Sequence, residues 1–186
     1  MVQMRVLLIN QDKELQDAVQ KSWFRTYLNP KYKYCHANYA EVLTFDENTW
    51  VNEYWVILND NDDIVGYVEG NINRITYNYS INLAVNFTDD KSTMGRGLAA
   101  IFGSIIHRNF HKIEWMMAKG NPIAKSYKRV LEELEGRIEG IKEDNVRLWD
   151  NEYTDAYMYA VMTSSIPPAV KAKYLRFYHR IFGSEA

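Results

Sequence analysis

Residues 81–102 read INLAVNFTDDKSTMGRGLAAIF and contain the pattern that decides the fold. Apolar and polar side chains alternate over residues 77–87, which predicts a strand with Tyr79, Ile81, Leu83, Val85 and Phe87 on one face. Polar residues 88–93 predict a loop, and residues 94–99 (MGRGLA) predict a glycine-containing turn. A helix is expected from there to residue 110. Backbone N–H groups at the start of such a helix can bind a phosphate or diphosphate.

The segments on either side of this stretch predict a mixed α/β fold. An apolar stripe at Leu15, Val19, Trp23 and Tyr27 predicts a helix that ends before Asn29 and Pro30. Residues 54–58 and 64–75 form a predicted hairpin around the Asn/Asp-rich turn at 59–63. Further strands are predicted at residues 5–10, 113–118, 136–141 and 153–162, and further helices at 122–134, with Asn121 as N-cap, and at 167–182. We expect a mixed sheet with helices on both faces.

Composition narrows the class of protein. The 186 residues suit one domain, and the net charge of −2 argues against a wholly basic nucleic-acid binder. Cys35 is the only cysteine, so it cannot form an intrachain disulfide, which agrees with a reducing compartment. No apolar run approaches the roughly 18 residues needed to span a bilayer. We therefore expect a cytoplasmic protein without a membrane partner.

The same segments resemble the GNAT acetyltransferase superfamily over about residues 51–162. Residues 94–99 match the family's pyrophosphate loop, Gln/Arg-x-x-Gly-x-Gly/Ala, and residues 83–85 occupy the strand end that bonds the pantetheine arm. Residues 115–121 match a strand followed by an Asn. Residues 129–134, 137–140 and 155–161 look like the ribosomal-protein N-terminal acetyltransferases. The resemblance implies a mostly antiparallel central sheet, with residues 163–186 as an added helical extension. It also implies acetyl-CoA as co-substrate and an amine as acceptor.

The resemblance also assigns candidate cofactor contacts. Met94 stands where the family usually has Gln or Arg, so Arg96 or Lys91 is expected to replace that contact. One alternative is that Gly95 and Gly97 only make a tight strand-to-helix connection. A second hypothesis for function is a GNAT-like module without catalysis that serves as a binding or structural protein. The predicted cofactor-binding residues are Leu83, Ala84, Val85, Met94, Gly95, Arg96, Gly97, Leu98, Ala99, Asn121 and Ser126.

Acetyl transfer to an amine needs a base for the ammonium and an acid for the thiolate. The family's Tyr would fall at Lys128, one residue past Tyr127, so Tyr127 is the predicted acid and Ser126 a weaker alternative. Glu69 and Glu114 are candidate bases acting through water, or else surface carboxylates. His107 and His111 are an i, i+4 pair without a third ligand, so no metal site is predicted. The acceptor is left open among a protein N-terminus, a lysine and a small amine.

The predicted C-terminal helix carries two faces. Val170, Tyr174, Tyr178 and Phe182 form an aromatic stripe, and Lys173, Arg176 and Arg180 form a basic face. The stripe is too aromatic to stay in water, so it either docks on its own chain or meets a second copy in a homodimer. The basic face would then be free for an acidic partner.

Overall fold

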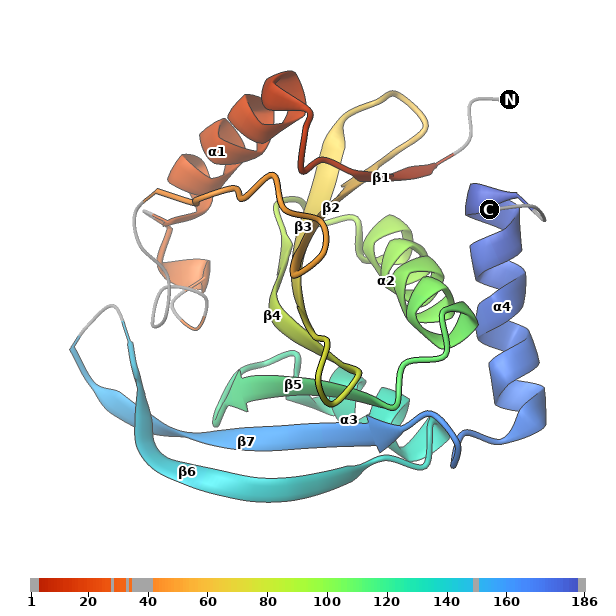
Figure 1. Ribbon diagram of the computed structural model, residues 1–186. Helices are drawn as coiled ribbons and strands as arrows, with labels where there is room; N and C mark the ends of the chain where they lie inside the picture. The colour runs from red at the N-terminus through yellow and green to blue at the C-terminus, as the bar shows by residue number, and fades with distance from the viewer. Residues whose placement is uncertain (1–3, 28, 33, 35–41, 149–150, 184–186) are drawn as a thin grey trace.

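The computed structural model describes residues 4–27, 29–32, 34, 42–148 and 151–183, so Cys35 lies outside the described residues. Within them a seven-stranded sheet has the order β1-β2-β3-β4-β5-β7-β6 (Figure 1). The strands are β1 (Arg5–Leu8), β2 (Asn52–Leu58), β3 (Ile64–Asn73), β4 (Asn78–Asn86), β5 (Lys112–Ala118), β6 (Arg137–Arg147) and β7 (Tyr153–Met162). The α-helices are α1 (Lys13–Tyr27), α2 (Lys91–His107), α3 (Ala124–Glu133) and α4 (Pro168–Phe182).

The sheet is mostly antiparallel, as expected. Its parallel pair is β4 with β5, which α2 connects. Two hydrophobic clusters lie on the two faces of the sheet. One contains Val19 and Trp23 of α1, and the other contains side chains of α2, α3 and α4 (Figure 1). Helices therefore cover both faces. Of the α1 stripe predicted from the sequence, Val19 and Trp23 are buried and Leu15 is partly buried.

A β-bulge at Asn82 changes the face that β4 presents. Glu69 of β3 pairs with Leu83, but Gly70 pairs with Ile81, so Asn82 is an extra residue in β4. Ile81 consequently packs in the α2-side cluster, whereas Leu83 packs in the α1-side cluster. The prediction that Tyr79, Ile81, Leu83 and Val85 share one face is therefore wrong beyond Ile81.

Helix α4 docks on its own chain. Tyr174 and Tyr178 are buried, and a Cβ added to Gly103 of α2 would lie 2.3 Å from the Tyr174 carbonyl oxygen. Phe182 reaches Trp55, with ring centroids 5.9 Å apart. Of the predicted basic face, the Lys173 ammonium pairs with Glu133 of α3 at 2.5 Å. The aromatic stripe therefore belongs to the fold, and Lys173 is engaged within the chain.

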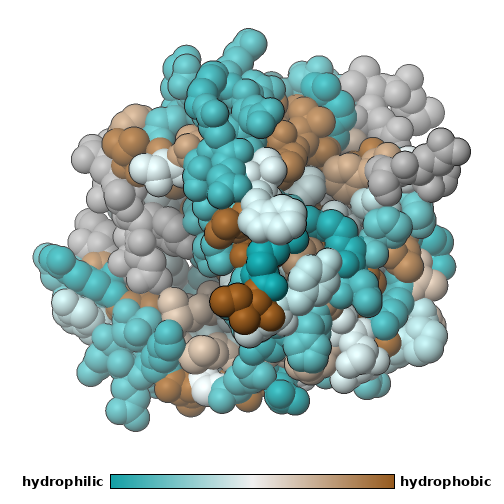
Figure 2. Space-filling model, in the orientation of Figure 1, coloured by the Kyte–Doolittle hydropathy of each residue, from teal (hydrophilic) through white to brown (hydrophobic). Residues whose placement is uncertain are grey.

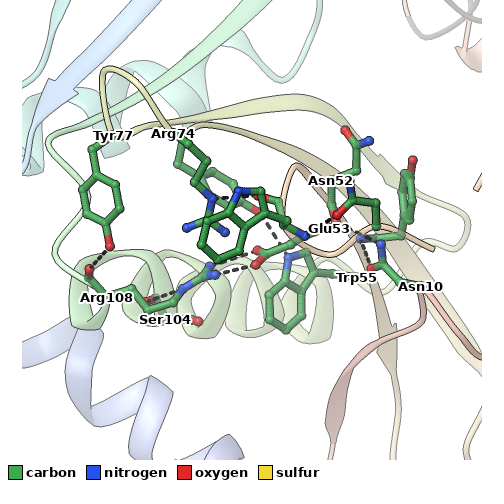
Figure 3. A network of polar contacts seen from close by, with 12 residues as sticks. Asn10, Asn52, Glu53, Trp55, Arg74, Tyr77, Ser104 and Arg108 are labelled. Carbon is green, nitrogen blue, oxygen red and sulfur yellow. Dashed lines mark hydrogen bonds and ion pairs between the residues drawn. The ribbon is translucent and has the colours of Figure 1, made fainter. Parts of the chain in front are cut away.

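A polar network ties the end of α2 to β2. The Arg108 guanidinium binds both carboxylate oxygens of the buried Glu53, as the dashed lines in Figure 3 show. Next to it, the Asn10 side chain donates to the carbonyl oxygens of Asp46 and Asn52. Bidentate Arg–carboxylate pairs fix geometry as well as adding energy. The network therefore fixes β2 against the end of α2.

Across the described ranges, no helix combines the length and the apolar character needed to cross a bilayer. Figure 2 shows a face covered mostly by hydrophilic residues, with hydrophobic residues in small separate groups.

Candidate active site

The candidate site lies where β4 and β5 diverge. The two strands form a parallel ladder only between residues 78–81 and residues 112–115. Both strands continue, as residues 82–86 and 116–118, without pairing with each other. The divergence begins at this point because the bulge at Asn82 turns β4 away from its neighbour β5. The facing strand edges are therefore open to another group that can form backbone-type hydrogen bonds.

Two pockets meet at the divergence. The first, here called the α3 pocket, is lined by residues of β4, β5 and α3 and of the segment before α3, which include Ala84, Met117, Asn121 and Tyr127. The sheet pocket has a volume of about 420 Å³ and contains Glu69, Ser80, Glu114, Glu139, Lys142 and Met158. Both pockets are lined by Ile81, Asn82, Trp115 and Met116. Two ligands bound in these pockets would meet at those shared residues.

Trp115 carries an unsatisfied donor at the junction. Its side chain is only 5% exposed and stacks on Tyr159, with centroids 5.6 Å apart and an interplanar angle of 11°. The Tyr127 ring lies 6.0 Å away. Among the residues that the structure describes, the buried indole Nε1–H has no hydrogen-bond partner. Leaving a buried donor unpaired costs about 1–3 kcal/mol, so this N–H is suited to a ligand oxygen.

Glu69 differs from the other carboxylates of the sheet pocket. It accepts a hydrogen bond from the Asn82 side-chain amide at 3.4 Å, and it has no ion pair within the described residues. Burial raises the pKa of Glu69, because desolvation disfavours its charged form. A carboxylate with a raised pKa in a pocket is a candidate proton acceptor.

The two other carboxylates share one lysine. The Lys112 ammonium lies 2.9 Å from Glu114 and 3.1 Å from Glu139. Glu114 also accepts a hydrogen bond from the Ser80 hydroxyl at 2.8 Å. The bond from Lys112 holds the pKa of Glu139 below its ordinary value. Glu114 and Glu139 are therefore already paired, which leaves Glu69 as the more available of the two predicted bases.

Comparisons with known proteins identify the fold. No family model matches the sequence, and no curated protein matches it significantly. Among solved structures, spermidine/spermine N-acetyltransferase SpeG from Vibrio cholerae has a TM-score of 0.62 at 17% identity, over 87% of this chain and 94% of that one. A probable GNAT-family acetyltransferase from Chromobacterium violaceum has a TM-score of 0.61 at 13% identity, over 81% and 85%. The fold is that of the GNAT acetyltransferases. The finer resemblance to the ribosomal-protein enzymes stays a prediction.

The GNAT loop motif does not form a turn here. Residues 94–99 lie inside α2, which begins at Lys91 because the Asp90 carboxylate caps it by accepting from the Thr93 N–H at 2.9 Å. The predicted turn is therefore wrong: the cap lies four residues before Met94. Gly95 and Arg96 are exposed on this helix, whereas Leu98 and Ala99 pack partly against the core.

Packing explains two of the residues matched to the motif. Met94 is 6% exposed, and its sulfur fills the space above Gly66, where a Cβ would lie 2.3 Å away. A Cβ on Gly97 would lie 2.6–2.7 Å from three side-chain atoms of Ile57. The Met94 side chain is therefore part of the core, and Gly97 is needed for the close approach of α2 to β2.

The start of α2 already pairs three of its own N–H groups. Thr93 is bound by the Asp90 side chain, Met94 by the Asp90 carbonyl oxygen, and Lys91 by the Asp89 carbonyl oxygen. The hydrogen bond from Thr93 lowers the pKa of Asp90, which therefore stays ionised. A diphosphate at this helix end would meet the Asp90 carboxylate, so this end of a coenzyme A molecule does not fit the arrangement seen.

The remaining predicted residues divide between the pockets and other places. Leu83, Ala84, Asn121 and Tyr127 line the α3 pocket, while Ser126 is exposed outside it. Lys128 is also exposed and lies 3.9 Å from Glu132, so Tyr127 is the one of the two that faces the pocket. Glu69 and Glu114 line the sheet pocket. Val85 is buried in the α1-side cluster and lines neither pocket.

Asn121 is not the N-cap that was predicted. Helix α3 begins at Ala124 with Ile123 as its cap, and the Asn121 side chain instead accepts from the Ile123 N–H at 3.1 Å. Sequence reasoning also missed Trp115, Asn82 and Lys142. No sequence pattern marks an indole N–H without a hydrogen-bond partner or a bulge inside an alternating strand. Lys142 could have been found by considering every charged residue on the predicted strands.

Proposed function

We propose that this protein is an acyl-CoA-dependent N-acyltransferase that transfers an acetyl group from acetyl-CoA to an amine. The observation that carries the proposal is the divergence of β4 and β5, with one pocket on each side and four residues shared between them. A thioester in the α3 pocket and an amine in the sheet pocket would meet beside Trp115. The GNAT fold supports this assignment.

The pantetheine arm would bind along the open strand edges. Its amide groups can pair with residues 82–86 and 116–118 as an added strand does. The Trp115 Nε1–H would donate to a carbonyl oxygen of the arm or of the acyl group. When bound, acetyl-CoA supplies an activated acyl thioester. The protein's part is to orient that group and to move protons.

Two residues would move those protons. Glu69 would accept a proton from the amine, and its raised pKa brings it closer to that of the ammonium that it deprotonates. Tyr127, in the α3 pocket, would supply a proton to the departing sulfur. Positioned general acids and bases each contribute roughly 10²–10⁴-fold to a rate.

The diphosphate would contribute little to affinity. Asp90 competes with it for the N–H groups of α2, and the exposed side chains of Lys91 and Arg96 are the cations nearest in sequence. We therefore expect acetyl-CoA and acetyl-pantetheine to bind with similar affinity. Calorimetry with both ligands measures this directly, and a hundredfold preference for acetyl-CoA would contradict it.

The proposal is tested by acetyl transfer to a panel of amines that includes spermidine, the amine named for the SpeG neighbours. Glu69→Gln should lower kcat roughly 10²-fold or more, the scale of a lost general base. Glu114→Gln should have a smaller effect, because Glu114 is already paired with Lys112. The opposite order of effects would make Glu114 the base.

A second candidate function is a GNAT-like module without catalysis. The capping of α2 by Asp90 favours it, because this cap occupies the place where the family binds the diphosphate. Such a module would bind neither acetyl-CoA nor acetyl-pantetheine at millimolar concentration. Binding of either ligand in the α3 pocket would reject this alternative.

A further inference from the structure

Three carboxylates and two ammonium groups surround the sheet pocket. Glu114 and Glu139 share Lys112, and Glu69 has no cation beside it within the described part of the chain. Lys142, on β6, also lines the pocket and forms no ion pair there among the described residues. One carboxylate and one ammonium are therefore free to act on a ligand.

These two free charges lie at opposite sides of the pocket. Glu69 is on β3 and Lys142 on β6, and strands β4, β5 and β7 lie between them. The apolar side chains of Met116 and Met158 line the pocket between the two charges. An amine whose reacting end lies at Glu69 would extend over these methionines toward Lys142. Its far end would meet a positive charge.

We propose that Lys142 is a specificity-determining residue that restricts the acceptor to amines with a single positive charge. A second ammonium at the far end would be repelled by Lys142, whereas an apolar or anionic group there would be accepted. The inference rests on the proposed assignment of the sheet pocket to the amine. It separates this chain from the SpeG neighbours, which are named for the polyamine spermidine.

The test compares 1-hexylamine with 1,6-diaminohexane, which match in length and differ by one charge. At low ionic strength kcat/KM for the monoamine should exceed that for the diamine by roughly threefold to tenfold, the effect of one partly screened charge. Lys142→Gln should bring the two amines within about twofold. The exposed Lys125 of α3 lines neither pocket, so Lys125→Gln is the matched control and should keep the wild-type ratio.

The same ratio can be read without turnover. If no amine is acetylated, the acyltransferase proposal fails, and binding of the two amines by calorimetry or NMR titration then tests the role of Lys142 alone. Weaker binding of the diamine, relieved by Lys142→Gln, supports the inference. Equal or better use of the diamine by the wild type, an unchanged ratio in Lys142→Gln, or binding of neither amine would overturn it.

Discussion

Replacing the two glycines of the loop motif separates packing from ligand binding. In Gly97→Ala the new Cβ would lie 2.6–2.7 Å from the fully buried Ile57, and such overpacking costs about 1–3 kcal/mol. The gain in helix propensity returns about 1 kcal/mol. Because Ile57 is fully buried, we expect a packing cost at the upper end of this range, about 3 kcal/mol, and therefore a net loss of about 2 kcal/mol. Gly95→Ala meets nothing within 4 Å and should stabilise the helix by about 0.5–1 kcal/mol.

Thermal unfolding measures both effects. For a chain of this size 1 kcal/mol shifts Tm by about 2–4 °C, so Gly97→Ala should lower Tm by about 4–8 °C and Gly95→Ala should raise it by about 1–4 °C. Ile57→Val removes one of the three crowding atoms. In a double-mutant cycle, the Gly97→Ala/Ile57→Val variant should therefore lose less stability than the sum of the single variants.

Acetyl-CoA affinity is measured on the same variants. If packing explains Gly97, Gly95→Ala keeps the wild-type affinity. The reasoning is refuted if Gly97→Ala is as stable as the wild type while either alanine abolishes acetyl-CoA binding, because the glycines would then serve as a phosphate cradle.

Three further variants test other parts of the structure. Trp115→Phe removes an N–H that has no partner among the described residues, together with part of a buried ring, so it should lower Tm through lost packing and also weaken acetyl-CoA binding by calorimetry about tenfold, the worth of one net hydrogen bond. Burial raises the pKa of Glu69, so its ionisation opposes folding. At pH values above the folded-state pKa, Glu69→Gln should therefore raise the urea midpoint. This advantage should disappear as the pH falls below the unfolded-state pKa. For the same reason wild-type turnover should fall on the acid side at a higher pH than for a free glutamate. Truncation after Ser165 removes α4, whose Tyr174 and Tyr178 pack against α2, and should give an aggregating or unfolded product by light scattering and circular dichroism. A folded truncated chain with the parent's Tm would show that α4 does not stabilise the fold.

The sequence predicted those helices and strands that a local feature marks, such as a proline at the helix start or alternating residue types. Helix α4 begins at Pro168, because proline suits the first helical position, and β7 covers the alternating residues 153–162 as predicted. The start of α2 was predicted too late, because Asp90 was read as part of a loop and not as a helix cap. The prediction relied on the two glycines and not on the capping residue, although the cap is what fixes the start of the helix.

The site was only partly predictable for a different reason. Tyr127, Asn121 and Glu69 were found through a resemblance and a residue type, and the structure places them in the two pockets. The bulge at Asn82 leaves the alternation of residue types intact, so a sequence cannot show that β4 changes faces there. The pairing of Lys112 with two carboxylates likewise depends on strand order, which brings β5 and β6 to the same pocket.

The most direct measurement of acyl transfer is mass spectrometry of an amine incubated with the protein and acetyl-CoA. With 1-hexylamine we predict N-acetylhexylamine and free coenzyme A in equal amounts, both strongly reduced in Glu69→Gln. Folded protein that yields no acetylated amine from any member of the panel, and that binds no acetyl-CoA, would contradict the proposed function.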